Sequence, residues 1–450
     1  MKTKTLPGPT LGVVGGGQLG RMLAEAAAPL GIELVVLDPT PDCPASAVCR
    51  DQIVGAFDDP DSVRELASRT DALTFEIELA DPDLLERVSE KFGVAVQPSP
   101  ATLRMIQDKL VQKRALQDAG IPVPAFRAVD SPEELRTALD ELGTPAMVKA
   151  REGGYDGRGN VPIEDSDEAE EVLEEIGGRA MVEEMVDFER ELSVIGVKGS
   201  AGHSPAGDRT SSDKKDEIAT YVAGENVHEE EILRETVVPA RASGAVRERA
   251  QAVAREVLDL LEGRGVYGIE LFEVSEERER GAIDRSASEE RTGSSEGRCA
   301  SLGPCERTVG PRADEATCEP SDSREGKEIL VNEIAPRPHN SGHWTIEGAR
   351  SSQFEQHARA VCGLPLGSTE LREPVVSKNI LGDERDSRKV TLSGVDRLLA
   401  EPLVHLHWYG KREVRPLRKM GHFTVLGGER SAEELLESAR TYRRHVEFEP

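Results

Sequence analysis

The alternation of short apolar runs with amphipathic helical runs in the first 100 residues most constrains how this chain folds. The runs "LGVVGG", "IELVVLD" and "ALTFEIE" predict strands, and the runs "QLGRMLAEAAAPLG", "DSVRELASRT" and "DPDLLERVSEKFG" predict helices between them. Strands that alternate with helices form a parallel sheet with helices on both faces. Residues 1–100 are therefore predicted to form one α/β domain.

The next 250 residues follow a different, α+β pattern. The run "LRMIQDKLVQKRALQDAG" predicts one helix over residues 103–120, closed by Gly120 and Pro122. Beyond it, the apolar runs "AMVKA", "AMVEEMV", "RELSVIGVKG", "GVYGIELFEV" and "EILVNEIAPR" predict strands. Helices are predicted near residues 131–142, 166–176 and 244–263.

Two segments interrupt this pattern, residues 199–216 and 275–327. Both are poor in apolar residues and rich in Ser, Gly, Glu and Arg, so they bury too little surface to offset the entropy of ordering. We expect two disordered insertions. The last 80 residues predict a small β-rich module with a helix over 431–444. The predicted domains are residues 1–100, 101–370 and 371–450.

Composition excludes several classes of protein. With 56 Lys plus Arg against 84 Asp plus Glu, the net charge is −28, which disfavours a nucleic-acid partner because phosphate binding needs a basic face. No apolar run approaches the roughly 18 residues that cross a bilayer, and the first residues lack a signal-peptide core. We expect a cytoplasmic protein without a membrane partner. Without a C-x-x-C pair, free thiols are expected at Cys43, Cys49, Cys299, Cys305, Cys318 and Cys362.

The run "KAREGGYDGRGN" predicts a phosphate-binding loop. Its glycines, Gly153, Gly154, Gly157 and Gly159, allow backbone amides to approach phosphate oxygens. Lys149 lies on the preceding strand and can reach the same phosphates as a point charge. An exposed glycine turn without a ligand is the alternative.

Two acids on separate predicted strands indicate a metal site. Glu270 lies in "YGIELF" and Glu333 in "VNEIAPR", with Asn332 beside it. Magnesium prefers carboxylate and amide oxygens beside nucleotide phosphates, so facing strand acids fit an ATP–magnesium site. Either acid alone could instead be a hydrogen-bonded core residue or the end of a strand.

The acidic run "MVEEMVDFERELSV" offers further contacts for a nucleotide. Backbone groups near Glu183 to Val186 could pair with an adenine edge, and Glu191 could bind ribose hydroxyls. A solvated acidic face is the alternative for Glu183, Glu184 and Glu191.

The glycines of "VVGGGQLG" allow a competing interpretation. Gly15, Gly17 and Gly20 fit the G-x-G-x-x-G spacing of dinucleotide-binding proteins, and Asp38 ends the next strand where an acid would bind a ribose. An NAD(P)-dependent oxidoreductase is therefore an alternative. It explains the first forty residues and no motif beyond them.

The motifs "GQLGRML", "TFEIE", "GGYDGRG", "VNEIAPRPHNSGHW" and "KREVRPLRKMGH", in this order, resemble those of the 5-(carboxyamino)imidazole ribonucleotide synthetases. These are ATP-grasp enzymes of purine biosynthesis that use ATP and bicarbonate to carboxylate 5-aminoimidazole ribonucleotide (AIR), giving ADP and phosphate. The resemblance covers residues 11–430 except the two insertions. It implies a Rossmann-like pre-ATP-grasp domain, an ATP-grasp domain and a small β-rich C-terminal domain, assembled as a homodimer.

The resemblance also implies roles for residues of this chain. The implied ATP contacts are Lys109, Lys149, Gly154, Tyr155, Asp156, Gly157, Arg158, Gly159, Asn160, Glu183, Glu184, Met185, Val186, Glu191, His228, Asn332 and Glu333. The implied AIR contacts are Gln18, Leu19, Glu76, Asn340, Lys411, Arg418 and Lys419. Glu270 and Glu333 are implied to hold Mg²⁺, which Mn²⁺ could replace.

Asp156, Arg158 and Lys149 are expected to act in catalysis, on the amine proton, the bicarbonate and the transferred phosphoryl group respectively. The chain departs from the family at Leu417, where glycine is common. Another ATP-grasp ligase, such as the formate-dependent glycinamide ribonucleotide enzyme, is the nearest alternative function. His405 and His407 lie two apart in a predicted strand, where packing is favoured over a metal pair because no third ligand is evident.

Overall fold

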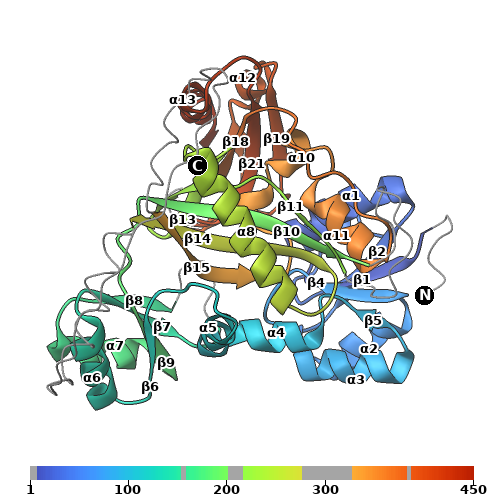
Figure 1. Cartoon of the computed structure of the whole chain (residues 1–450). Helices are drawn as coiled ribbons and strands as arrows, with labels where there is room; N and C mark the ends of the chain where they lie inside the picture. Colours follow the sequence, from blue (N-terminus) through green and yellow to red (C-terminus); the bar gives the residue numbers. More distant parts are fainter. Residues whose placement is uncertain (1–7, 154–158, 201–215, 276–326, 383–386, 450) are drawn as a thin grey trace, which may run out of the picture.

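The computed structural model of the chain describes residues 8–153, 159–200, 216–275, 327–382 and 387–449. Figure 1 shows an N-terminal domain in blue, a central part from cyan to orange, and a C-terminal module in red. Most of the two predicted insertions, with Cys299, Cys305 and Cys318, lies outside the described residues. Cys43, Cys49 and Cys362 are free thiols. In the described part of the chain, no helix is long and apolar enough to span a membrane.

The N-terminal domain is the predicted parallel sheet with helices on both faces. Its strand order is β3-β2-β1-β4-β5, and every neighbouring pair is parallel. The strands are β1 (Thr10–Val14), β2 (Glu33–Asp38), β3 (Asp51–Val54), β4 (Ala72–Phe75) and β5 (Ala95–Val96). The helices are α1 (Gln18–Ala27), α2 (Pro60–Ser68) and α3 (Pro82–Phe92). Glu76 follows the end of β4 directly, which brings it to the same sheet edge as the turn after β1.

The single helix predicted over 103–120 is wrong, because the chain breaks at Asp108. Helix α4 (Pro100–Gln107) ends there and α5 (Lys109–Asp118) begins. Asp108 has extended backbone angles, and its side chain accepts hydrogen bonds from the amides of Leu110 and Val111, which caps α5. The break places Lys109 at the first position of a new helix.

The central part contains a small antiparallel sheet of order β6-β9-β7-β8, and helices α6 (Pro132–Leu142) and α7 (Ala169–Ile176) pack on it. Figure 1 shows this unit at the lower left, apart from the larger sheet. Its strands are β6 (Phe126–Val129), β7 (Ala146–Ala150), β8 (Asn160–Ile163) and β9 (Ala180–Glu184). The strand pair β7 and β8 brackets the predicted phosphate loop.

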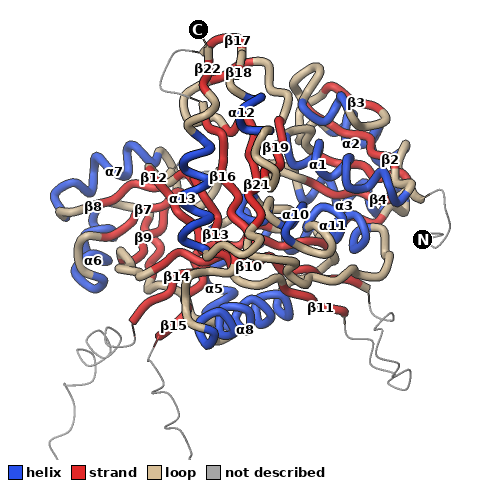
Figure 2. Tube along the Cα trace, turned by 90° about the horizontal axis from the view of Figure 1, so that it is seen from above, coloured by secondary structure: helices blue, strands red, loops and turns tan. Residues whose placement is uncertain are grey.

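The large sheet runs in the order β15-β14-β10-β12-β13-β16-β21-β19, with β11 paired to β10. Helix α8 (Gly244–Leu260) covers one face of its central strands, as Figure 2 shows from above. The central strands are β10 (Arg190–Gly199), β11 (Glu217–Thr220), β12 (Gly224–Glu229), β13 (Ile232–Val238), β14 (Gly265–Ser275) and β15 (Lys327–Ala335).

The C-terminal module extends this sheet through β16 (Val375–Leu381), β19 (Val404–Trp408) and β21 (Lys419–Leu426). Strand β16 pairs with β13, so the central sheet continues across the predicted domain boundary near residue 370. The predicted terminal helix is α13 (Ala432–Arg443), and its Leu435 and Leu436 pack on Val376 and Phe423. The remaining short elements are β17 (Arg388–Lys389), β18 (Leu392–Ser393), α12 (Val395–Leu399), β20 (Glu413–Val414) and β22 (Glu447–Phe448).

Helix α11 (Gln353–Val361) joins the N-terminal domain to the large sheet. Its Phe354, Ala358 and Val361 belong to the same buried cluster as Leu19 and Leu23 of α1. The helix also packs on β10 and β14. The helix is therefore one of the elements that fix the relative position of the two domains, beside contacts such as that of Arg264 N with Gln97 Oε1.

Candidate active site

A cavity of about 1060 Å³ lies where the N-terminal domain, α5, the large sheet and the C-terminal module meet. It brings together nine of the predicted site residues from these four parts. They are Gln18, Leu19, Glu76, Lys109, His228, Glu270, Glu333, Asn340 and Lys419.

The two predicted metal acids face each other on paired strands. Glu270 of β14 and Glu333 of β15 are register partners, and the register shifts immediately after them, leaving Asn332 as the extra residue of a bulge. Burial and the charge of Glu333 raise the pKa of Glu270 to about 7. Burial alone would also raise the pKa of Glu333, but Lys109, whose Nζ lies 2.8 Å from Glu333 Oε1, lowers it. Lys109 neutralises only part of the negative charge of the two carboxylates. The remaining negative charge favours the binding of a divalent cation.

Lys149 is held in a buried triad with Glu183 and Lys113. Lys149 Nζ lies 2.6 Å from Glu183 Oε2, and Lys113 Nζ lies 2.7 Å from Glu183 Oε1. Lys149 also donates to Asn332 Oδ1 at 3.4 Å. Lys113 and Glu183 are each 3% exposed, so both oxygens of this carboxylate are engaged by lysines rather than open to a nucleotide.

Two cations share one anion in this triad, and the pKa values reflect the sharing. Burial lowers the pKa of Lys113 to about 8; the charge of Glu183 opposes this shift, and the positive charge of Lys149 adds to it. Burial would lower the pKa of Lys149 as well, but Glu183, Glu333 and Glu270 together raise it. Lys149 therefore keeps its positive charge at neutral pH, as a phosphate-binding lysine must.

The rest of the predicted adenine segment lies on the edge of the small sheet. Glu184 exchanges two hydrogen bonds with the backbone of Ala125, one through its amide and one through its side chain. Met185 is exposed and Val186 is half-buried. The Glu183 carboxylate is therefore not available to adenine, and a contact of the backbone of residues 183–186 with adenine stays a prediction.

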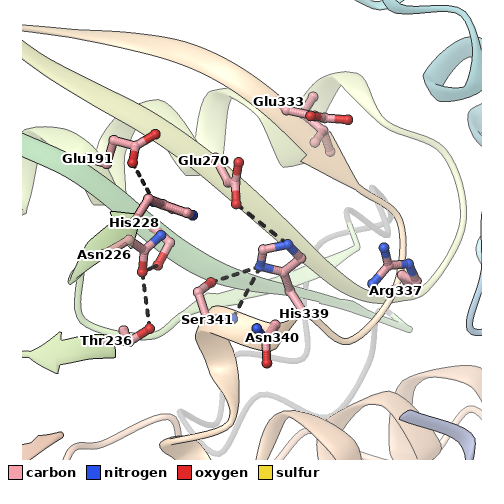
Figure 3. Close-up of polar contacts among 12 residues, drawn as sticks. Glu191, Asn226, His228, Thr236, Glu270, Glu333, Arg337, His339, Asn340 and Ser341 are labelled. Carbon is pink, nitrogen blue, oxygen red and sulfur yellow. Dashed lines mark hydrogen bonds and ion pairs between the residues drawn. The ribbon is translucent and has the colours of Figure 1, made fainter. Parts of the chain in front are cut away.

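Glu191 and His228 form a pair on adjacent strands β10 and β12. His228 Nδ1 contacts Glu191 Oε2 (Figure 3). His228 also lines the cavity. Burial would lower the pKa of His228, but the hydrogen bond and charge of Glu191 raise it. The carboxylate and the imidazole of this pair can form hydrogen bonds with ribose hydroxyls.

The glycine turn after β1 is built around two acids. Glu76 accepts hydrogen bonds from the amides of Gly17 and Gly20, and Gly16 N donates to Asp38 Oδ2 at 2.9 Å. Gly15 has φ 108°, and a Cβ there would lie 2.3 Å from Glu76 Cγ, so the glycine makes room for this carboxylate. Glu76 thereby fixes the turn that carries Gln18 and Leu19 into the cavity.

This geometry removes the main support for a dinucleotide site. Asp38 is 8% exposed, and its carboxylate accepts hydrogen bonds from the amides of Gly16 and Thr40. The Asp38 carboxylate is therefore already hydrogen-bonded to the backbone and not free to bind a ribose. The amides of Gly17 and Gly20 donate to Glu76, where a dinucleotide site would direct them to a pyrophosphate.

The C-terminal module contributes Lys419 to the cavity, whereas Lys411 and Arg418 do not line it. Lys411 Nζ donates to the backbone oxygen of Lys419 at 2.7 Å, and Arg418 donates to the backbone oxygen of Glu413 at 2.9 Å. Leu417 adopts φ 59°, in the left-handed region that favours glycine, so the turn keeps the backbone conformation that the expected glycine would adopt.

The remaining predicted residues fall into two groups. Eleven are described but do not line the cavity: Lys149, Gly159, Asn160, Glu183, Glu184, Met185, Val186, Glu191, Asn332, Lys411 and Arg418. Five lie outside the described residues: Gly154, Tyr155, Asp156, Gly157 and Arg158.

Several charged residues of the cavity had no predicted role, among them Arg104, Asp108, Arg151 and Arg337. Arg337 Nε pairs with Glu78 Oε1 at 2.7 Å, and Arg151 pairs with Asp108 through two hydrogen bonds. The position of Arg337, four residues after Glu333 in "VNEIAPRPH", was the available signal. Arg104 and Arg151 carried none, since isolated arginines in an acidic chain are common surface residues.

His407 pairs with Glu347 at 2.7 Å and stacks on His422, while His405 is exposed. Within the described ranges, no group of three or more His, Cys, Asp or Glu side chains is arranged to hold a metal ion. His407 therefore packs on His422 and pairs with Glu347.

Comparison with known proteins agrees with this geometry. Residues 9–107 match the ribonucleotide synthetase preATP-grasp domain, residues 114–279 and 323–354 the ATP-grasp domain, and residues 376–438 the phosphoribosylaminoimidazole carboxylase C-terminal domain. The fold and site thus define an ATP-grasp ligase with a preATP-grasp domain.

Similar proteins narrow the class to one family. N5-carboxyaminoimidazole ribonucleotide synthase of Brucella melitensis is 36% identical, over 94% of this chain and 98% of its own length. The synthetase from Thermotoga maritima has a solved structure with a TM-score of 0.75 and 36% identity, covering 98% of this chain and 99% of that one. The synthase from Aspergillus clavatus, solved with ADP and AIR, has a TM-score of 0.75 and 31% identity, covering 97% of this chain and 98% of that one.

The chain belongs to the N5-carboxyaminoimidazole ribonucleotide synthase family. The predicted family, fold class and ligase class are confirmed, as is the use of ATP. The reaction of this family is the ATP-dependent carboxylation of AIR in purine biosynthesis.

Proposed function

We propose that the cavity carries out this carboxylation with bicarbonate as the source of carbon. The observation that carries the proposal is that one cavity is lined by Lys109 and the Glu270–Glu333 pair and also by Gln18 and Asn340. The first group is suited to a triphosphate and the second, with neutral hydrogen-bonding groups, to an aminoimidazole ring. A phosphoryl donor and an amine acceptor can therefore meet in one cavity.

ATP binds, in this proposal, with its phosphates between Lys109, Lys149 and the glycine loop 154–160. Its adenine lies at the backbone of residues 183–186. Its ribose lies at Glu191 and His228, which are already paired and oriented. Asn332 keeps Lys149 directed toward the phosphates through its side-chain oxygen.

Glu270 and Glu333 hold Mg²⁺, and Mn²⁺ could replace it. Two hard carboxylate oxygens from paired strands, with a raised pKa at Glu270, fit such an ion. When bound, the ion supplies electrostatic neutralisation of the transferred phosphoryl group. Lys109 shares this task, because it already lies 2.8 Å from Glu333.

The reaction proceeds in two steps. A bicarbonate oxygen attacks the γ-phosphorus of ATP, and the bond from this phosphorus to the bridging oxygen breaks. The products of this step are ADP, which keeps the bridging oxygen, and carboxyphosphate, which stays in the cavity. The exocyclic amine of AIR then forms a bond to the carbon of carboxyphosphate, or of the carbon dioxide released from it in the cavity. In either case the carbon–oxygen bond to phosphate breaks, phosphate leaves, and the amine loses a proton. Asp156 is proposed to take this proton and Arg158 to hold the bicarbonate; both lie outside the described residues. Arg337 places a further guanidinium on the cavity wall beside Glu78.

AIR binds at Gln18, Leu19 and Asn340, with its phosphate toward Lys419, Lys411 and Arg418. Glu76 supports this binding by fixing the turn of Gln18 and Leu19. Of the three C-terminal cations, Lys419 lines the cavity and is the first expected contact.

An assay of ADP release tests the proposal. We expect ADP to form only with AIR and bicarbonate together, and Asn340→Ala to raise the KM for AIR while leaving the KM for ATP within about twofold. ADP formation with glycinamide ribonucleotide and formate, and none with AIR, would establish the alternative ligase instead.

We further propose the domain limits 1–100, 101–370 and 371–450, a homodimer, and a cytoplasmic enzyme without a nucleic-acid or membrane partner. The net charge of −28 supports the absence of a nucleic-acid partner. Light scattering on the purified chain tests the homodimer, which predicts about twice the 48.9 kDa chain mass.

A further inference from the structure

The central domain contributes His339 and Asn340 to the side of the cavity where AIR is proposed to bind. His339 Nε2 lies 3.6 Å from Glu270 Oε1, and its Nδ1 lies 2.8 Å from Ser341 Oγ (Figure 3). Asn340, the next residue, lines the same cavity. The position of one short stretch of backbone therefore sets the position of both side chains.

Gln353, the first residue of α11, clamps this backbone at two points. Its Oε1 accepts a hydrogen bond from His339 N at 2.9 Å, and its Nε2 donates to His339 O at 2.7 Å. Its own amide donates to Thr345 Oγ1 at 2.9 Å, so it also holds the far end of the segment. The Gln353 side chain is fully buried, which leaves water no access to replace these bonds.

Two glycines close the space around the clamp. A Cβ at Gly342 would lie 2.5 Å from Gln353 Oε1, and a Cβ at Gly268 would lie 2.5 Å from the Cβ of His339. The segment is thus confined between β14 on one side and the Gln353 amide on the other. A shift of the backbone toward either side meets packed atoms.

Helix α11 also contacts the N-terminal domain, one turn after Gln353. His357 Nε2 lies 2.8 Å from Thr74 Oγ1 on β4, and Val266 N donates to His357 Nδ1 at 3.1 Å. Thr74 precedes Glu76 by two residues. One helix therefore relates the segment of His339 to the turn that carries Gln18.

We propose that Gln353 is a positioning residue for AIR. It acts through the backbone of His339, and it sets the distance between Asn340 and the groups that the N-terminal domain supplies. The inference rests on the proposed placement of AIR at Asn340. Gln353 does not line the cavity, so its effect on AIR is indirect.

Gln356 provides a matched control on the same helix. It is also fully buried, and it clamps another backbone in the same way: its Nε2 donates to Gly367 O at 2.7 Å, and Gly367 N donates to its Oε1 at 2.8 Å. Gly367 does not line the cavity. Gln353→Leu and Gln356→Leu each remove two hydrogen bonds of one chemistry, at the site and away from it.

The experiment compares steady-state kinetics and thermal unfolding of the two leucine variants. Both should unfold at lower temperature by similar amounts. Gln353→Leu should lower kcat/KM for AIR by about 10- to 100-fold, the usual cost of a displaced binding group, with the KM for ATP within about twofold. Gln356→Leu should keep both constants within about twofold. Gln353→Glu, which retains an acceptor for His339 N, should fall between Gln353→Leu and the unsubstituted chain.

Equal losses of kcat/KM for AIR in Gln353→Leu and Gln356→Leu would overturn the inference, as would an unchanged constant in both Gln353 variants. If Gln353→Leu does not fold, the comparison of Gln353→Glu with Gln356→Glu decides by the same criterion. Asn340→Ala separates this inference from the proposed function. If Asn340→Ala leaves the KM for AIR unchanged, the placement of AIR fails; if it raises that KM while the Gln353 variants match their controls, only the positioning role fails.

Discussion

Glu183→Gln removes the one anion between two buried ammonium groups, and we expect it to lower the free energy of unfolding by about 3–5 kcal/mol. Lys113 Nζ and Lys149 Nζ lie 2.7 and 2.6 Å from the two carboxylate oxygens, and the Glu183 side chain is 3% exposed, so solvent screens the pairs little. Burial alone would raise the pKa of Glu183, but the two lysines lower it from 4.5 to about 2. At about 1.4 kcal/mol per pH unit, this corresponds to about 3 kcal/mol.

The same pKa gives the pH range of the effect. Because the folded-state pKa lies below that of the unfolded chain, the stabilisation is complete above about pH 4.5 and is lost as the pH falls toward 2. Loss of the carboxylate also leaves Lys149 with its 3.4 Å contact to Asn332. We therefore expect the KM for ATP to rise in Glu183→Gln.

Urea unfolding at pH 7 measures the change, with Glu184→Gln as the control. Glu184 is the next residue and is half-buried, and its Oε1 accepts a hydrogen bond from Ala125 N that a glutamine oxygen can keep. Its substitution should cost less than about 0.5 kcal/mol. If Glu183→Gln lies within about 1 kcal/mol of Glu184→Gln, the triad does not stabilise the domain as argued.

Three further predictions concern the metal, the buried histidine and the cap of α5. Glu270→Gln and Glu333→Gln should each lower kcat by about 100-fold or more and raise the Mg²⁺ concentration for half-maximal rate; an unchanged Mg²⁺ dependence would refute their role as ligands. His357 is neutral in the folded chain because burial lowers its pKa to about 3. The unfolded chain takes up this proton more readily, so the free energy of unfolding should fall as the pH falls from about 6.5 toward 3. His357→Gln should reduce this dependence on pH when unfolding is measured across the same range. Asp108→Ala should cost about 1 kcal/mol more than Asp108→Asn, because asparagine keeps the cap of α5 while both lose the charge pair with Arg151; equal unfolding midpoints would contradict this.

The sequence was sufficient for the fold class because its signals are local. The alternation of strands and helices in the first 100 residues requires a parallel sheet, and β1 to β5 form one. The break at Asp108 was missed because the apolar spacing continues across it, and an aspartate within a helical run reads equally as a surface residue or a cap. Only the backbone angles at Asp108 separate α4 from α5.

The site was predictable where the residue types of a motif indicate one kind of chemistry. Glu270 and Glu333 could be paired from the sequence since each lies in an apolar strand, where an acid is unusual, and they face each other in the sheet. The roles of Glu183 and Gln353 could not be predicted in this way. Their partners Lys113 and His339 are 70 and 14 residues away in the chain and meet them only through tertiary packing. Buried polar contacts of this kind leave no pattern of spacing in a single sequence.

A crystal structure with a non-hydrolysable ATP analogue, Mn²⁺ and AIR would locate the metal ion and both substrates in the cavity. We expect an anomalous Mn²⁺ peak between the carboxylates of Glu270 and Glu333, the γ-phosphate within reach of Lys149, and the aminoimidazole ring beside Asn340. A metal ion bound elsewhere, or a triphosphate distant from Glu270 and Glu333, would contradict this expectation.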